Sequence, residues 1–281
     1  SVQMARTKSK EQAIGSQNRT VTPNEAKLAL THCIKLQRPI MMWGAPGIGK
    51  SDIVKQIADS QKREVIDIRL PLWEPTDIKG IPYYNAKENN MVWASPAELP
   101  TNEKSTSIIF LDELNSAAPA VQAAAYQLIL NRRVGQYKLP KGVSIVAAGN
   151  RDSDKGVTYR MPAPLANRFV HIELRVDYDD WMEWATTNHI HADVVGYCTF
   201  AKQDLYDFDP RGSSRSFATP RSWSFVSQLL SDDLPESTLT DLVAGCVGEG
   251  LAVKFMNHRK VSGQLPNPSD ILNGKVKDLK T

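Results

Sequence analysis

A glycine-rich segment near residue 50 constrains this chain more than any other feature. It lies between an apolar run, Ile40–Trp43, and a stretch with apolar residues at helical spacing from Ile53 to Ala58. It fits the pattern G-x-x-x-x-G-K-[ST], in which glycines let backbone N–H groups close around phosphates at a helix N-terminus. The flanking strand and helix patterns favour this interpretation over a glycine-rich turn without a ligand. The residues expected to bind a nucleotide are Gly44, Ala45, Pro46, Gly47, Ile48, Gly49, Lys50, Ser51 and Asp52.

Two side chains of this segment and two later carboxylates are expected to share the chemistry. Lys50 is expected to reach the β and γ phosphates of ATP, and Ser51 to ligate Mg²⁺. A further apolar run, Ile108–Leu111, ends in Asp112 and Glu113. At a strand's carboxyl end a carboxylate points into the ligand crevice, so we expect Asp112 to hold Mg²⁺ through water and Glu113 to act as the general base. Solvated carboxylates of an ordinary turn are the alternative.

Apolar runs and helical patterns alternate along the first part of the chain. Continuous apolar runs suit strands that are buried on both faces of a parallel sheet. These runs are Ile40–Trp43, Val65–Leu70, Ile108–Leu111, Val143–Ala148 and Phe169–Leu174. After Asp177 only helical patterns follow, near 178–188, 190–203, 220–231 and 236–257. The sequence therefore predicts an α/β core followed by a smaller all-helical domain.

Composition and charge divide the chain further. Residues 1–20 are polar and basic, which predicts a flexible tail because such a segment buries too little apolar area to offset chain entropy. The expected domains are this tail, a nucleotide-binding core at 21–176 and a helical lid domain at 177–281. The four basic residues and one acidic residue of the tail account for the whole formal charge of +3. The balanced remainder makes a broad basic surface for nucleic acid less favoured.

The apolar runs and the cysteine spacing of the sequence indicate where in the cell the protein is expected. No run of eighteen or so apolar residues is present, and the polar start is not followed by the apolar stretch of a secretion signal. Cys33, Cys198 and Cys246 are widely spaced, so neither a disulfide framework nor a zinc site is indicated. We therefore expect a cytoplasmic protein without a membrane segment.

The order of these motifs resembles the AAA+ superfamily over residues 21–272. The run Leu111-Asp112-Glu113-Leu114-Asn115-Ser116-Ala117, with Gln122, is similar to the MoxR-type branch of bacteria and phages. The resemblance implies a five-stranded parallel sheet of order 5-1-4-3-2 with a helical lid. It also implies ATP hydrolysis with Mg²⁺ in a homo-oligomer, a hexamer in this branch. A protein client or a von Willebrand factor A domain protein is the implied partner.

Three further site residues follow from this resemblance. Asn150 ends the fourth apolar run, where the family places a polar sensor of the γ-phosphate. Arg168 lies before the fifth run, where the family carries an arginine finger that serves the neighbouring subunit, and Arg151 and Arg160 are nearby competitors. Arg221 matches the second sensor. The alternatives are a turn-forming Asn and solvated or salt-bridged arginines.

Two hairpins are expected as inserts, near 80–95 and 133–141. The first is followed by a helix start at Ser95–Glu98. The inserts resemble the helix-2 insert and the pre-sensor hairpin of the MoxR branch. Their aromatic residues either contact a partner or pack across the strands, and packing is expected for at least half of them. These residues are Tyr83, Tyr84, Trp93 and Tyr137.

These features together favour an ATPase in which hydrolysis drives chaperone-like remodelling of a partner protein complex. A nucleic-acid motor or loader of the AAA+ class is one rival, and it predicts salt-sensitive DNA binding. A scaffold that uses nucleotide only to assemble is the other, and Glu113 argues against it because a static clamp needs no base.

Overall fold

The computed structural model describes residues 19–151, 160–209, 212 and 214–264 of the chain. It divides after Asp177 into two compact units, each described by itself below. Most of the predicted tail, residues 1–18, lies outside the described residues. Among the residues that are described, no helix is long and apolar enough to cross a membrane.

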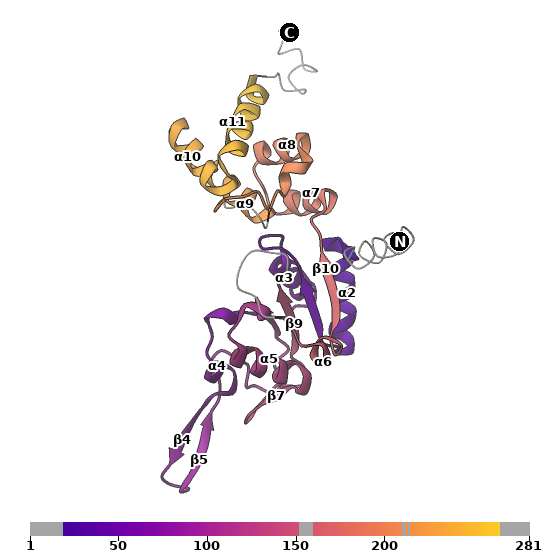
Figure 1. Cartoon of the computed structure of the whole chain (residues 1–281), viewed down its shortest axis with the longest axis vertical. Helices are drawn as coiled ribbons and strands as arrows, with labels where there is room; N and C mark the ends of the chain where they lie inside the picture. The colour runs from indigo at the N-terminus through magenta and orange to yellow at the C-terminus, as the bar shows by residue number, and fades with distance from the viewer. Residues whose placement is uncertain (1–18, 152–159, 210–211, 213, 265–281) are drawn as a thin grey trace, which may run out of the picture. The chain divides into compact units, whose positions relative to one another are not determined.

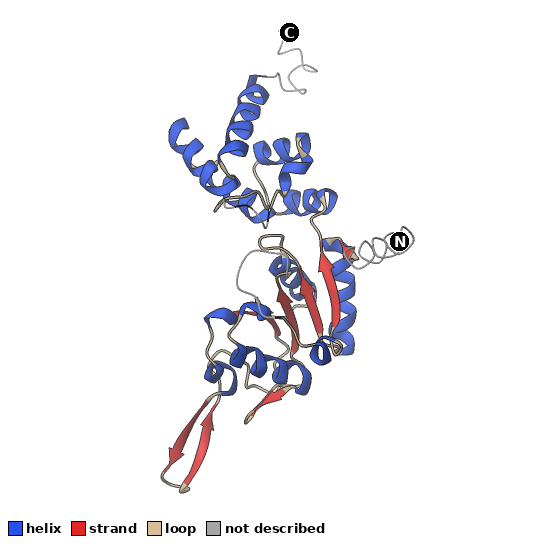
Figure 2. Cartoon of the chain, viewed as in Figure 1, coloured by secondary structure: helices blue, strands red, loops and turns tan. Residues whose placement is uncertain are grey.

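The first unit is built on a six-stranded parallel sheet of order β1-β10-β2-β9-β6-β3 (Figures 1 and 2). The strands are β1 (Thr20–Val21), β2 (Ile40–Trp43), β3 (Val65–Arg69), β6 (Ile108–Asp112), β9 (Ser144–Gly149) and β10 (Val170–Leu174). The five predicted strands are all present, and their predicted order is confirmed.

The strand β1 corrects the prediction of five strands and of a tail that reaches residue 20. Thr20 and Val21 pair with Glu173 and Leu174 on the outer side of β10. Arg175 strengthens this edge, because its backbone N–H donates to Val21 O at 2.9 Å and its Nη1 donates to Thr20 O at 2.9 Å. The two residues of β1 pair with backbone groups of β10 that would otherwise form an open sheet edge. A strand of two residues is too short to be recognised from an apolar pattern in the sequence.

Helices cover the sheet on both faces. Met41, Ile109 and Leu111 share one core cluster with apolar residues of α5 (Pro119–Asn131). The alternate strand residues point to the other face, where α2 (Pro23–Leu36) and α3 (Lys50–Ser60) pack against the strands and each other. The helix α2 begins as expected, since Thr22 Oγ1 accepts a hydrogen bond from the backbone N–H of Glu25 at 3.2 Å.

Two small hairpins extend from the first unit. They pair β4 (Ile81–Asn85) with β5 (Asn90–Ala94) and β7 (Arg133–Val134) with β8 (Tyr137–Lys138). Figure 1 shows that the β4–β5 hairpin projects beyond α4 (Pro75–Lys79) and away from the sheet of its unit.

The expected helix start at Ser95–Glu98 was wrong, because the chain forms bends there. Gly80 allows the chain before the hairpin to approach the chain after it. Its φ is 82°, and a Cβ on it would lie 2.0 Å from Ala94 O and 3.6 Å from Pro96 Cδ. The two ends of the hairpin therefore cross in close contact. Pro96 and Leu99 are then buried without helical backbone.

The second unit contains only helices in its described part. These are α7 (Tyr178–Thr187), α8 (Ala192–Phe200), a short 3-10 helix (Lys202–Leu205), α9 (Pro220–Leu229), α10 (Glu236–Val247) and α11 (Glu249–Gln264). Tyr197, Trp223 and Phe255 form its aromatic centre, with ring centroids 5.5–5.7 Å apart. The single helix expected over 236–257 is two helices, because Gly248, with a φ of 94°, ends α10.

Candidate functional site

The glycine-rich segment lies between β2 and α3, at the carboxyl edge of the sheet. Gly44 N–H donates to Gly149 O at 3.2 Å, so the segment starts beside the end of β9. Gly47 and Gly49 have φ values of 79° and 98°, which glycine adopts more readily than other residues. Gly49 caps α3 without any side-chain hydrogen bond to the first turn. The start of α3 has no capping side chain, and the backbone N–H groups of such a helix start suit an anionic ligand.

The Lys50 side chain turns back into this segment and is buried, with 8% of its surface exposed. Its Nζ donates to Gly44 O, to Ala45 O at 3.4 Å and to Gly149 O at 3.5 Å. The same Nζ donates to Asn150 Oδ1 at 3.3 Å. A buried ammonium needs such acceptors, and it supplies positive charge at the centre of the loop.

Asp112 ends β6 and Glu113 follows it at the same carboxyl edge, and both are half-buried. The backbone N–H of Glu113 donates to Asp112 Oδ1 at 2.8 Å. Glu113 has a φ of 56° and a ψ of 37°, in the left-handed region. A non-glycine residue there carries strain of about 1–3 kcal/mol, which is typical of functional turns. Burial, followed by the negative charge of Asp112, raises the pKa of Asp67 on the neighbouring strand β3.

A residue without an assigned role, Asn115, joins the ends of β6 and β9. It lies in the 3-10 helix Leu114–Ser116, directly after Glu113. Its Nδ2 donates to Asn150 O at 2.8 Å, and its Oδ1 accepts from Asn150 N–H at 3.2 Å. The only signal for it in the sequence was its place in the run 111–117. The structure therefore brings Lys50, Asn115 and Asn150 together.

The three competing arginines lie at different places. Arg151 follows β9 at the carboxyl edge, and its Nη1 is 3.6 Å from Glu173 Oε1 in the same chain. Arg168 is exposed and comes before β10, after the short helix α6 (Ala163–Ala166). Because β10 is parallel to β2 and Val170 is opposite Ile40, Arg168 lies at the amino edge. Arg160 is exposed. The assignment of Arg168 as the finger stays a prediction.

Arg221 belongs to the second unit, in the first turn of α9. Thr219 caps this helix, because its Oγ1 accepts from the backbone N–H of Ser222 at 3.1 Å. Arg221 itself is exposed. Its role as a second sensor stays a prediction.

The hairpin aromatics fall into two groups. Tyr137 is a core residue with 5% of its surface exposed, and its hydroxyl donates to Pro100 O at 2.6 Å. Burial raises the pKa of Tyr137 to about 12. Tyr83, Tyr84 and Trp93 are 50%, 58% and 38% exposed. Partner contact is therefore an option for the β4–β5 hairpin and not for Tyr137.

We expect this difference to appear in stability measurements. Replacement of Tyr137 by Ala should lower the free energy of unfolding by about 3–5 kcal/mol, as for other buried aromatic residues. Tyr84→Ala should change it by less than about 0.5 kcal/mol, because the side chain is largely solvated. Urea unfolding followed by tryptophan fluorescence measures both values. Equal losses in the two variants would contradict the assignment.

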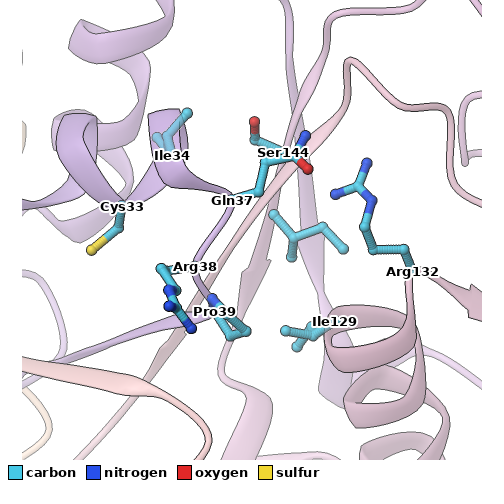
Figure 3. A pocket seen from close by; sticks show the side chains of 9 residues that line it. Cys33, Ile34, Gln37, Arg38, Pro39, Ile129, Arg132 and Ser144 are labelled. Carbon is cyan, nitrogen blue, oxygen red and sulfur yellow. The ribbon is translucent and has the colours of Figure 1, made fainter.

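A small pocket is lined by Pro39, just before β2, and by Ser144, the first residue of β9, and so lies at the amino edge of the sheet (Figure 3). It has a volume of about 20 Å³, and its lining includes Cys33, Gln37, Arg38, Arg132 and Ser144. A space of this size holds about one water molecule. Arg132 is already bonded, since its Nη2 donates to Pro140 O and Val143 O at 2.8 Å. The pocket is therefore no site for a nucleotide.

Comparison with known proteins shows what this part of the chain is similar to. Residues 39–171 match the model described as ATPase family associated with various cellular activities (AAA). Midasin of Giardia intestinalis is 27% identical over 186 residues, which cover 63% of this chain and only 4% of that protein.

Solved structures with a similar chain course have low sequence identity. A putative ATPase from Cytophaga hutchinsonii is 22% identical with a TM-score of 0.46, covering 62% of this chain and 52% of that one. The Thermotoga maritima RuvB Holliday junction branch migration motor is 17% identical with a TM-score of 0.45, covering 84% of this chain and 67% of that one.

The family model spans both the glycine-rich segment after β2 and the paired carboxylates at the end of β6. Residues 39–171 are therefore similar to the ATPase domains of the AAA family.

Proposed function

We propose that this chain is a Mg²⁺-dependent ATPase that works in a ring of identical subunits and remodels or matures a partner protein complex. The observation that carries the proposal is the buried Lys50 ammonium, held among the Gly44 and Ala45 carbonyls and Asn150 Oδ1. It lies beside a helix start without a side-chain cap. This combination suits a triphosphate, because a cation and the backbone N–H groups of a helix start belong to the same loop.

The side chains at the carboxyl edge have separate tasks in this proposal. Lys50 and the N–H groups at residues 44–52 bind the phosphates. Ser51 and Asp112 would hold Mg²⁺, which neutralises negative charge on the β and γ phosphates when bound. Glu113 accepts the proton of the attacking water, and Asn150 orients the reacting groups from the end of β9.

Arg168 suits a role in a neighbouring subunit. The strand β2 separates the amino edge from the glycine-rich segment, and its four residues span about 13 Å in a parallel sheet. An exposed guanidinium at that edge is far from the phosphate site of its own chain. We infer that it completes the site of the next subunit, which makes hydrolysis depend on assembly. The resemblance to the MoxR branch suggests six subunits.

The β4–β5 hairpin is the proposed contact with the partner. Its exposed side chains are largely apolar or aromatic: Ile81, Tyr83, Tyr84, Met91 and Trp93. Such a surface suits a protein partner better than nucleic acid, whose backbone requires positive charge. A client protein or a von Willebrand factor A domain protein in the cytoplasm is the partner that the resemblance suggests. Arg221 would then couple the helical unit to the state of the nucleotide.

The nucleotide site is tested by the Lys50→Ala variant. We expect ATP binding to weaken about ten- to a hundredfold, since charge-assisted hydrogen bonds contribute about 1.5–3 kcal/mol. Titration calorimetry with ATP and Mg²⁺ measures the affinity, and phosphate release measures turnover. Lys55→Ala, an exposed position on the same helix, is the matched control. Unchanged affinity and turnover in Lys50→Ala would overturn the proposed function.

A further inference from the structure

Asn115 makes an unusual pair of contacts for a residue outside the recognised motifs. Its side chain is buried, with 1% of the residue exposed. Both of its polar ends bond the backbone of one residue, since Nδ2 donates to Asn150 O and Oδ1 accepts from Asn150 N–H. An amide held at both ends has a fixed orientation, and it fixes the peptide groups on either side of Asn150.

The neighbouring residue leaves just enough room for this contact. A Cβ on Gly149 would lie 2.6 Å from Asn115 Oδ1 and 2.7 Å from Met41 Cε. Any larger residue at position 149 would therefore displace the Asn115 amide or Met41. Gly149 O also accepts from Lys50 Nζ at 3.5 Å. The end of β9 thus contacts Asn115 on one side and Lys50 on the other.

The contacts form a chain from the base to the cation. Asn115 follows Glu113 by two residues, in the 3-10 helix that starts at the strained Glu113 backbone. Asn115 holds the backbone of Asn150, and Asn150 Oδ1 accepts from Lys50 Nζ at 3.3 Å. A change in the turn of Glu113 would therefore move Asn150 relative to Lys50.

We propose that Asn115 is a positioning residue for ATP hydrolysis: it fixes Asn150 relative to Glu113 and Lys50 through its two hydrogen bonds. This inference rests on the proposed function. Asn115 does not touch the reacting atoms itself. Its contribution passes through Asn150, so it disappears when the Asn150 side chain is absent. A buried amide that only stabilises the fold would not show this dependence.

A double-mutant cycle on turnover tests the proposal. Asn115→Ser removes the two-ended contact, and we expect kcat to fall about ten- to a hundredfold, as for misplaced catalytic groups. The affinity for ATP should change less than about threefold, because Lys50 and the loop amides remain. In the Asn150→Ala background, Asn115→Ser should lower kcat by less than about twofold further. Asn115→Ala serves in the same cycle if the serine variant unfolds.

Gln122→Ala is the matched control, because Gln122 is also a buried amide. It bonds Ala117 O at 3.0 Å and the Tyr126 hydroxyl at 3.2 Å, and not Asn150. We expect Gln122→Ala and Asn150→Ala to act independently, so that Gln122→Ala changes kcat by the same factor in the wild-type and in the Asn150→Ala background. If Asn115→Ser lowers kcat by the same factor with and without the Asn150 side chain, the positioning role is overturned, while the proposed function stands. Absence of ATP turnover in the wild-type protein would overturn the proposed function, and with it this inference.

Discussion

Replacement of Glu113 by Gln is expected to lower ATP turnover by about a hundred- to ten-thousandfold, the contribution of a positioned general base. Glutamine keeps the length of the side chain and can adopt the same left-handed backbone as Glu113, whose φ is 56°. It lacks only the carboxylate to which the proposed function assigns the proton. ATP should still bind with nearly the wild-type affinity, because Lys50 and the N–H groups of α3 remain.

The measurement combines steady-state phosphate release with calorimetric titration of ATP and Mg²⁺. Glu103→Gln is the matched control, since Glu103 is exposed in the turn before β6 and undergoes the same chemical change. It should retain wild-type turnover. A Glu113→Gln variant that hydrolyses ATP as fast as the wild type would exclude Glu113 as the base. Loss of ATP binding in this variant would assign the residue a structural role.

Arg168→Ala is expected to lower turnover by about a thousand- to a hundred-thousandfold, the effect of an arginine finger. The physical reason is that a guanidinium stabilises the negative charge on the transferring phosphoryl group, in a site that excludes water. Arg168 lies at the amino edge of the sheet, so we expect this charge to reach the site of a neighbouring subunit. Folding should be unaffected because the side chain is exposed.

Mixing two inactive variants shows whether Arg168 acts in the site of a neighbouring subunit or in the site of its own chain. In a ring that contains equal parts of Arg168→Ala and Glu113→Gln subunits, about a quarter of the sites combine an intact base with an intact neighbouring arginine. Turnover should therefore return in the mixture, in proportion to that fraction. No recovery would show that Arg168 acts within its own chain or not at all. Arg160→Ala and Arg151→Ala, tested in the same way, decide between the three arginines.

Local chemistry explains how much of this molecule could be predicted. The glycine-rich pattern specifies its own loop, because glycine backbone freedom and a helix start are properties of neighbouring residues. Continuous apolar runs likewise specified the strands and, with the resemblance to AAA+ proteins, their order. The helix α2 was predictable from Thr22 and Glu25, since a cap involves residues three apart.

Contacts between distant segments decided the rest. In the sequence Tyr137 is an aromatic residue of a predicted hairpin, but in the structure it is buried and its hydroxyl donates to Pro100 O, 37 residues away. Tyr83 and Tyr84 look the same in the sequence and are exposed, because their hairpin extends beyond the core. Helix boundaries also failed where a glycine mattered, at Gly248, since helical spacing continues across it.

The amino-acid sequence by itself determined a glycine-rich loop before a helix, an acidic strand end and a parallel sheet that places both at one edge. Only the tertiary structure decided that Asn115 holds Asn150, 35 residues away, and that Arg168 lies at the other edge. The reason is that a motif records the chemistry of adjacent residues. The distance and direction between two motifs depend on how strands pair and on which side chains fit between them.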